Sequence, residues 1–528
     1  MMGLNRQKMK TRFLALFLAL LQTAVILLMA GCGSSGGSGQ KAPSSSVAVQ
    51  KPVVVALGAD TRTLLPMKIV DQTTYQQLRH IYDTLLTRDP KTYQLAPNLA
   101  TSWRALDDRT WEFKLRKGVK FHNGEPFTAE SVKVTIEKIL DKSWQSHYYT
   151  RFDMIDKIET PDDYTVIIHT KQPSPILLLR MQSLMPMPPK LLKEKGIDEL
   201  AKHPVGVGPY KFVSWTKDEK LELEANPDYW GGKPEIEKLV FRPIPEFSSR
   251  LSALLTGEVD VIQSLPVSAV DQVNNSGKAR VESVPSARIN YIALTNFKPG
   301  PLSDRRIRQA LNYAVDVDGI IKYVMKGHAY RMAGALSNIN PEVNKELKPY
   351  PFDVAKAKAL FKEAGVDPTK LTLTMDSPQG RYPMDKEVAQ AVAAELKKNL
   401  GIEVKITFNE WGTHLDKIVK RQTGDMFLLG WGPALDAEGT IGDLAVKDRT
   451  YSGFAADPEL QKMIDDARPI VDPVKRKAAW DAIQKKVYDE AIWIFLWQQE
   501  DLYGVSNRIN FTPRSDEEIE MWKATYRK

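Results

Sequence analysis

Residues 206–262 read GVGPYKFVSWTKDEKLELEANPDYWGGKPEIEKLVFRPIPEFSSRLSALLTGEVDVI, and the pattern of this stretch is the most informative in the chain. Apolar and polar side chains largely alternate in three of its segments, which predicts strands at residues 210–214, 221–225 and 239–244. Turns are predicted between them at Asn226-Pro227-Asp228 and at Gly231-Gly232, because Asn and Gly tolerate turn conformations. The remaining elements are a helix over 248–256 and a strand over 259–262. The stretch therefore predicts a small sheet joined by turns.

The first 31 residues are typical of a secretory signal. Residues 5–12 are basic, residues 13–30 are mostly apolar, and small residues flank Cys32, the only cysteine of the chain. Leu28-Met29-Ala30-Gly31-Cys32 resembles a lipoprotein cleavage site. An uncleaved transmembrane anchor is the alternative, because the apolar run is long enough to span a bilayer. We expect cleavage and lipidation, since a lone cysteine cannot form an internal disulfide.

The composition is that of a soluble globular protein, with 43% hydrophobic and 26% charged residues. A chain of 528 residues exceeds what one hydrophobic core normally holds, so two or three domains are expected. Removal of residues 1–31, which contain four basic and no acidic residues, lowers the formal net charge from +8 to +4. So mild a charge gives no argument for nucleic acid binding.

Hydrophobic periodicity places helices and strands along the rest of the chain. A helix is predicted at residues 73–86, and another begins with Ser303 as its cap. The strands predicted near the carboxyl end lie at 289–295, 371–375, 403–408, 425–430, 492–497 and 502–505. The helices predicted between three of these strands lie at 385–400 and 413–421. This βαβαβ order indicates a parallel sheet with right-handed crossovers.

Five stretches resemble, in the same order, the bacterial extracellular solute-binding proteins of family 5, the peptide- and nickel-type receptors of ABC importers. They are RKGVKFHNGEPFTAESVK (116–133), residues 206–262, LSDRRIRQALNYAVD (302–316), FDVAKAKALFKEAG (352–365) and GDMFLLGWG (424–432). Together these stretches extend over nearly the whole chain that follows Cys32.

The resemblance implies an α/β fold of the class II periplasmic-binding-protein type. Such a fold has two lobes joined by a hinge, here with an extra subdomain inserted in the first lobe. The expected divisions are a signal peptide at 1–31, a flexible tether at 32–50, first-lobe segments at 51–94, 205–297 and 485–528, an inserted subdomain at 95–204, and a second lobe at 298–484.

The chain lacks the motifs of common enzymes, and we expect no catalytic residues. It has no Gly-x-Ser-x-Gly elbow, and Gly206-Val207-Gly208 precedes a strand instead of opening a helix, which argues against a dinucleotide site. The seven histidines show no metal-ligand spacing, and the chain has only one cysteine, so a site with several cysteine ligands is excluded. We therefore expect no cofactor and no protein-built metal site, although a chelated metal can still enter as cargo.

Aromatic residues at strand ends are candidate ligand contacts. Most of the 11 tryptophans are expected in the core, because burial is the usual use of so large a ring. Trp411 and Trp431 follow two predicted strands, and ligands of open α/β sheets sit beyond the carboxyl ends of strands. The other aromatic candidates are Tyr75 and Trp497.

Arg381 lies between the strand 371–375 and the helix 385–400, where a solvated surface arginine is the ordinary alternative. In peptide-binding members of the family an arginine at a similar place binds the ligand's carboxylate, which a guanidinium does with two parallel hydrogen bonds. The same members carry an aspartate after the tryptophan, and that aspartate pairs with the ligand's α-amino group. Ala434 aligns there in this chain. Asp436 either replaces the aspartate after a loop shift or caps the turn near Gly439.

The resemblance implies a lipid-anchored receptor that faces the periplasm or the cell exterior. It would capture a small peptide or peptide-like solute, close about its hinge, and deliver the solute to ABC permease subunits. A monomer is expected, reaching the membrane only through its lipid and binding no nucleic acid. A nickel-chelate or oligosaccharide receptor of the same family stays open, as does a lipid-anchored envelope enzyme or chaperone on this scaffold.

Overall fold

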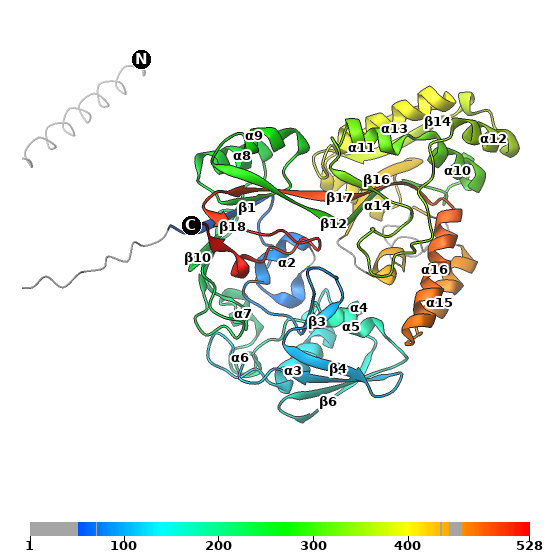
Figure 1. The fold of residues 1–528 in the computed structure, drawn as a ribbon. Coiled ribbons are helices and arrows are strands. Elements are labelled where there is room, and N and C mark those ends of the chain that lie inside the picture. Colours follow the sequence, from blue (N-terminus) through cyan, green and yellow to red (C-terminus); the bar gives the residue numbers. More distant parts are fainter. Residues whose placement is uncertain (1–50, 70, 433–435, 443–452, 455–456) are drawn as a thin grey trace, which may run out of the picture. The chain divides into compact units, whose positions relative to one another are not determined.

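A computed structural model describes residues 51–528 except 70, 433–435, 443–452 and 455–456 (Figure 1). The predicted signal, the tether, Cys32 and Ala434 therefore lie outside the described residues. Among the helices that the structure describes, none combines the length and the apolar character needed to cross a membrane.

The strands predicted in the stretch 206–262 are present, but they are part of an 11-stranded main sheet and not a small sheet of their own. The elements of this stretch are β8 (Tyr210–Thr216), β9 (Lys220–Ala225), β10 (Lys238–Pro243), α8 (Phe247–Thr256) and β11 (Val261–Gln263). Strand β1 (Val53–Leu57) lies between β10 and β11 and runs parallel to both. Alternate residues of β9, Leu221 and Leu223, are buried, so the period-two pattern marks the face that packs on the core.

Two glycines fix the entrance to this sheet. A Cβ atom at Gly206 would lie 2.0 Å from the Ile81 carbonyl oxygen, and one at Gly208 would lie 2.6 Å from the same atom. The Gly208 N–H donates to that oxygen over 2.9 Å. Only glycine permits so close an approach of two backbones.

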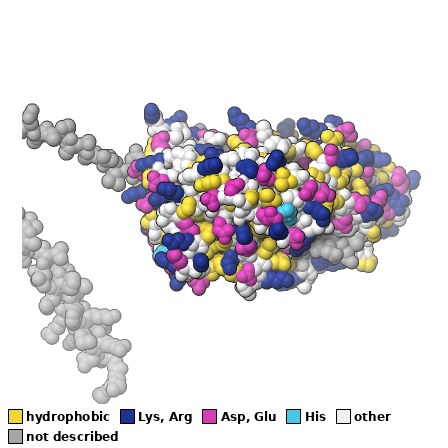
Figure 2. Space-filling view, turned by 90° about the horizontal axis from the view of Figure 1, so that it is seen from below, with side chains coloured by type: hydrophobic (Ala, Val, Ile, Leu, Met, Phe, Trp, Pro, Cys, Tyr) yellow, Lys and Arg dark blue, Asp and Glu magenta, His cyan; other side chains and the backbone are white. Residues whose placement is uncertain are grey.

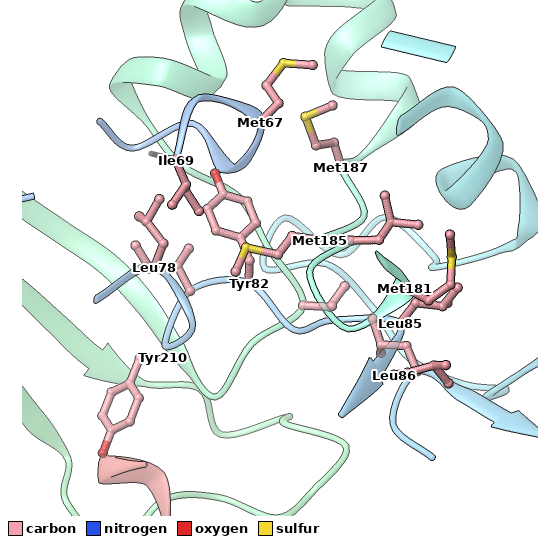
Figure 3. Close-up of a cluster of buried hydrophobic side chains, with 14 of the residues drawn as sticks. Met67, Ile69, Leu78, Tyr82, Leu85, Leu86, Met181, Met185, Met187 and Tyr210 are labelled. Atoms are coloured by element: carbon pink, nitrogen blue, oxygen red, sulfur yellow. The ribbon is translucent and has the colours of Figure 1, made fainter. Parts of the chain in front are cut away.

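The predicted helix at 73–86 is shorter in the structure. Helix α2 (Gln72–Leu78) ends before Ile81. The backbone groups that follow bond to distant segments, since Tyr210 donates to the His80 carbonyl and Leu85 donates to the Leu184 carbonyl. These tertiary hydrogen bonds replace the helical ones, while Leu78, Tyr82 and Leu85 are buried in a core cluster. Figure 3 draws part of that cluster, in which Leu78, Tyr82 and Leu85 come together with Met181, Met185 and Met187.

The predicted inserted segment contains a separate four-stranded sheet of order β4-β5-β7-β6. Its strands are β4 (Ala100–Ala105), β5 (Thr110–Leu115), β6 (Ile155–Asp162) and β7 (Thr165–Thr170). Helix α3 (Ala129–Leu140) contacts β6 and β7.

Two long antiparallel strands, β12 (Ala279–Leu294) and β17 (Trp493–Ser506), join the main sheet together (Figure 1). At one end β17 pairs with β11, and at the other end β12 pairs with β16 (Met426–Trp431). The separate strands predicted at 492–497 and 502–505 are one continuous strand. Gln498–Asp501 are polar and interrupt the apolar pattern, but their backbones continue the ladder.

The register of these strands shifts between Pro285 and Ile289. Pro285 pairs with Glu500 and Ile289 pairs with Gln498, so a step of four residues along β12 matches a step of two along β17. Such a bulge bends the strand and redirects its side chains. The bulge also separates the hydrophobic clusters. The buried residues of two clusters lie before residue 280 or after residue 501, and those of the other two clusters lie within residues 289–497. The lobe boundaries stay a prediction.

The predicted βαβαβ unit is present. Strand β14 (Thr372–Pro378) pairs in parallel with β15 (Glu403–Asn409) and with β16. The connecting helices are α13 (Asp385–Leu400) and α14 (Trp411–Val419). The predicted Ser303 cap is wrong: Asp304 caps α10 (Arg305–Ala314), and its carboxylate accepts from the Arg306 N–H, because Ser303 belongs to a preceding 3₁₀ turn.

The remaining long helices flank the same unit. They are α12 (Val354–Ala364), which contacts α10, and α15 (Pro458–Ala467) and α16 (Pro473–Asp489), which contact each other.

Candidate ligand-binding site

Arg381 and Trp411 are neighbours at the carboxyl ends of β14 and β15. The guanidinium carbon of Arg381 lies 5.1 Å from the centre of the Trp411 ring and 5.2 Å from that of Tyr382. The two rings meet edge to face, with centroids 5.9 Å apart. Contact with two aromatic faces favours a cation and restricts its freedom. The expectation that strand ends gather these side chains agrees with the geometry.

Asp385 shapes the loop that carries Arg381. Its buried carboxylate accepts hydrogen bonds from the backbone N–H groups of Gly380, Arg381, Tyr382 and Lys386, at 3.0, 2.9, 3.1 and 2.9 Å. All the acceptor capacity that faces the loop is thus used by the backbone. These hydrogen bonds fix the loop and do not involve the Arg381 side chain.

The guanidinium of Arg381 makes no ion pair with any carboxylate of the described residues. The residue is exposed, yet nearby protein atoms desolvate it enough to lower its pKa, and the positive charge of Arg288 lowers that pKa further. A cation in this position gains from an anion brought from outside the protein.

Arg288 lies in the β12 bulge and links three parts of the chain. Its Nε and Nη2 atoms donate to the two carboxylate oxygens of Glu517 over 2.8 and 3.0 Å. Its Nη1 donates to the Gly430 carbonyl over 3.4 Å, and the Tyr382 hydroxyl donates to the same oxygen over 3.0 Å. The bulge, the end of β16 and the carboxyl-terminal segment therefore meet at this arginine.

Asp501 is a second buried carboxylate beside this group. Its Oδ1 accepts from the Gln499 side chain over 2.6 Å, while Oδ2 is buried without a hydrogen-bond partner among the described residues. Burial raises the pKa of Asp501 to about 7, and the negative charge of Glu517 contributes to the shift. This carboxyl group is therefore substantially protonated near neutral pH.

Trp431 and Asp436 lie at the end of β16. The Trp431 indole N–H donates to the Gly439 carbonyl over 3.3 Å, and the Asp436 carboxylate accepts from the Gly439 N–H. Asp436 thus caps the turn, which is one of the two roles predicted for it. Burial lowers the pKa of Arg88, and Asp436, Asp516 and Glu342 oppose that shift.

Tyr75 contributes from α2 on the other side of the bulge. Its hydroxyl donates to the Gln182 carbonyl over 3.3 Å and approaches Glu518 Oε1 at 3.5 Å. Burial and the charge of Glu518 raise the pKa of Tyr75, so it stays a neutral hydrogen-bonding group.

Trp497 belongs to the same hydrophobic cluster as Tyr382, and Trp411 packs against that cluster. Trp497 is 2% exposed and packs in this cluster, which includes Leu496 and Met426. Its ring fills the core, which is the usual use of tryptophan, and its role as a ligand contact stays a prediction.

Sequence reasoning missed Arg288, Glu517, Asp501 and Tyr382. Arg288 and Asp501 sit in polar stretches that hid the continuity of β12 and β17. The acidic run Asp516-Glu517-Glu518 near the carboxyl terminus was the one available signal, since carboxylates so close together need cations nearby when buried.

The described residues show no cluster of three or more His, Cys, Asp or Glu side chains fit to hold a metal ion. On the face shown in Figure 2, basic and acidic side chains are interspersed. The candidate site is therefore built from arginine, aromatic rings and single carboxylates.

Comparisons with known proteins agree with this fold. The family model of the bacterial extracellular solute-binding proteins, family 5 (middle region), matches residues 94–448. Glutathione-binding protein GsiB of Pectobacterium atrosepticum is 29% identical over 467 residues, which cover 86% of this chain and 90% of that protein. The probable D,D-dipeptide-binding periplasmic protein DdpA of Escherichia coli K12 is 29% identical over 482 residues, with 87% and 90% covered.

Solved structures share the fold along nearly the whole chain. The periplasmic binding protein DppA from Helicobacter pylori, in complex with the peptide STSA, has a TM-score of 0.76 at 28% identity, covering 90% of this chain and 98% of that one. The substrate-binding protein CtaP from Listeria monocytogenes has a TM-score of 0.83 at 23% identity, covering 90% and 99%. The mixed α/β fold that the resemblance implied is confirmed, and the chain belongs to the bacterial extracellular solute-binding proteins, family 5.

Proposed function

We propose that this protein is the exported substrate-binding receptor of an ABC importer and that it binds small peptides or peptide-like solutes through a free carboxylate. The observation that carries this proposal is the Arg381 guanidinium, which lies against Trp411 and Tyr382 and makes no ion pair with a described carboxylate. A guanidinium so placed can donate two parallel hydrogen bonds to the two oxygens of a ligand carboxylate.

The other predicted residues have places in this proposal. Trp411 and Trp431 offer ring faces at the ends of β15 and β16, the two strands that flank β14, and Tyr75 offers a neutral hydroxyl from α2. Asp436 is committed to the turn at Gly439 and contributes negative charge near the site. Relatives named for glutathione and for a dipeptide support a peptide-like ligand, because both ligands carry carboxylates.

Capture would couple binding to movement about β12 and β17, which pair with each other and connect β16 on one side of the main sheet to β11 on the other. A ligand held between the two sides stabilises a closed arrangement more than an open one. The protein then presents the closed form to its permease and performs no chemistry of its own.

The test uses two equimolar tripeptide libraries, one with free carboxylates and one with carboxyl-terminal amides. The purified protein should retain members of the acid library, identified by mass spectrometry, and solution scattering with a retained peptide should give a smaller radius of gyration. Retention of both libraries to the same extent contradicts carboxylate recognition. Tight binding without compaction contradicts capture by closure.

Anchoring through Cys32 is part of the proposal and has its own test. Cys32→Ala should abolish incorporation of labelled fatty acid, because the only thiol of the chain is lost. Gly33→Ala is the matched control and should be acylated normally. Equal acylation of the Cys32→Ala variant would rule out the lipoprotein assignment.

A further inference from the structure

We propose that Arg288 is a positioning residue: it holds Glu517 away from Arg381 and so keeps the Arg381 guanidinium free for the carboxylate of a ligand. The inference rests on the proposed function and adds a residue that touches no ligand. It explains why an arginine in a region rich in carboxylates is left without an internal partner.

Two carboxylates are the obvious internal competitors for Arg381. Glu517 and Asp385 both act on Arg381 electrostatically, favouring its charged form. A protein carboxylate that paired with Arg381 would occupy the two donor positions that a ligand needs. The site therefore works only if both competitors are held elsewhere.

Asp385 is held by the backbone. Four N–H groups, from Gly380, Arg381, Tyr382 and Lys386, donate to its two oxygens. Because the same hydrogen bonds fix the Arg381 loop, this carboxylate cannot turn to the guanidinium without dismantling the loop.

Among the described residues, Arg288 is the one that donates to the Glu517 carboxylate. The pair is bidentate, at 2.8 and 3.0 Å, and the two side chains are only 7% and 8% exposed. The backbone at Arg288 packs closely against Gly432, since a Cβ atom there would lie 2.7 Å from the Arg288 Cα, and the neighbouring Ala287 N–H donates to the Ser515 carbonyl over 2.7 Å. Arg288 also repels Arg381 electrostatically, which keeps the second guanidinium from approaching Glu517.

Removal of Arg288 would leave Glu517 buried without its cation, which is a costly state. Arg381 already interacts electrostatically with Glu517 and makes no ion pair with a described carboxylate. An ion pair between Glu517 and Arg381 would relieve the buried charge and block the ligand site at the same time. Asp501 is a weaker competitor near neutral pH, because burial raises its pKa to about 7.

The experiment measures the preference of each variant for the acid tripeptide library over the amide library. Arg288→Gln should lower that preference by about tenfold or more, whereas Glu517→Gln alone should keep it, because the competitor is neutral. The double variant, Arg288→Gln with Glu517→Gln, should return to within about threefold of the natural protein.

Arg308→Gln is the matched control, because Arg308 is also buried and pairs with a glutamate, Glu490, over 2.9 Å. It should lower stability without changing the library preference. If Arg288→Gln keeps the preference of the natural protein, or if the double variant does not recover it, Arg288 does not hold Glu517 away from Arg381. If the natural protein itself shows no preference, the proposed function fails first, and this inference fails with it.

Discussion

Arg381→Ala is expected to weaken the binding of a tripeptide with a free carboxylate by about 2–5 kcal/mol, because the ligand's carboxylate would keep its desolvation cost and lose its charge-assisted pair. The carboxyl-terminal amide of the same peptide is neutral, so the substitution leaves no unpaired carboxylate in the complex. Its affinity should change by less than about 1 kcal/mol. Isothermal titration with the two peptides measures both values.

Arg421→Ala is the control for this measurement. Arg421 also lies over an aromatic ring, with its guanidinium carbon 5.7 Å from the centre of the Phe297 ring, but it follows the carboxyl end of α14, whereas Trp411 begins that helix. Its substitution should change neither affinity. An equal loss of affinity for the acid and the amide peptide in Arg381→Ala would show that the residue supports the loop but does not bind the ligand's carboxylate.

Asp501→Asn is expected to raise the free energy of unfolding by about 2–4 kcal/mol at pH 8. The folded protein raises the pKa of Asp501 from 3.8 to about 7, so the folded state binds this proton more tightly than the unfolded state. The stability that the group contributes is complete below pH 3.8 and is lost as the pH rises to about 7. Asparagine resembles the protonated acid and carries no such loss.

Urea unfolding at pH 5 and pH 8 checks this prediction. The stability difference between the variant and the natural protein should be larger at pH 8 than at pH 5. Asp228→Asn, at an exposed carboxylate, should change stability by less than about 0.5 kcal/mol at both values. A stability difference that is the same at both pH values would mean that Asp501 is ionised in the folded protein throughout this range.

Much of the architecture follows from local sequence. The strands of residues 206–262 and the βαβαβ unit were predictable because side-chain periodicity reports which face of an element is buried. The neighbourhood of Arg381 and Trp411 was predictable as well, because parallel strands end at one edge of the sheet. For these features, patterns within a few tens of residues carry the necessary information.

Tertiary structure alone decided the rest. Helix α2 stops at Leu78 because backbone groups near Ile81 bond to Gly208 and Tyr210, and Trp497 is buried because β17 runs continuously through the core. Arg288 and Glu517 stand 229 residues apart, so no local pattern announces their pair. Whether a charge in the sequence is free or paired depends on which distant segment folds against it. In this protein that long-range packing pairs Glu517 with Arg288. It leaves the Arg381 guanidinium without an ion pair among the described residues.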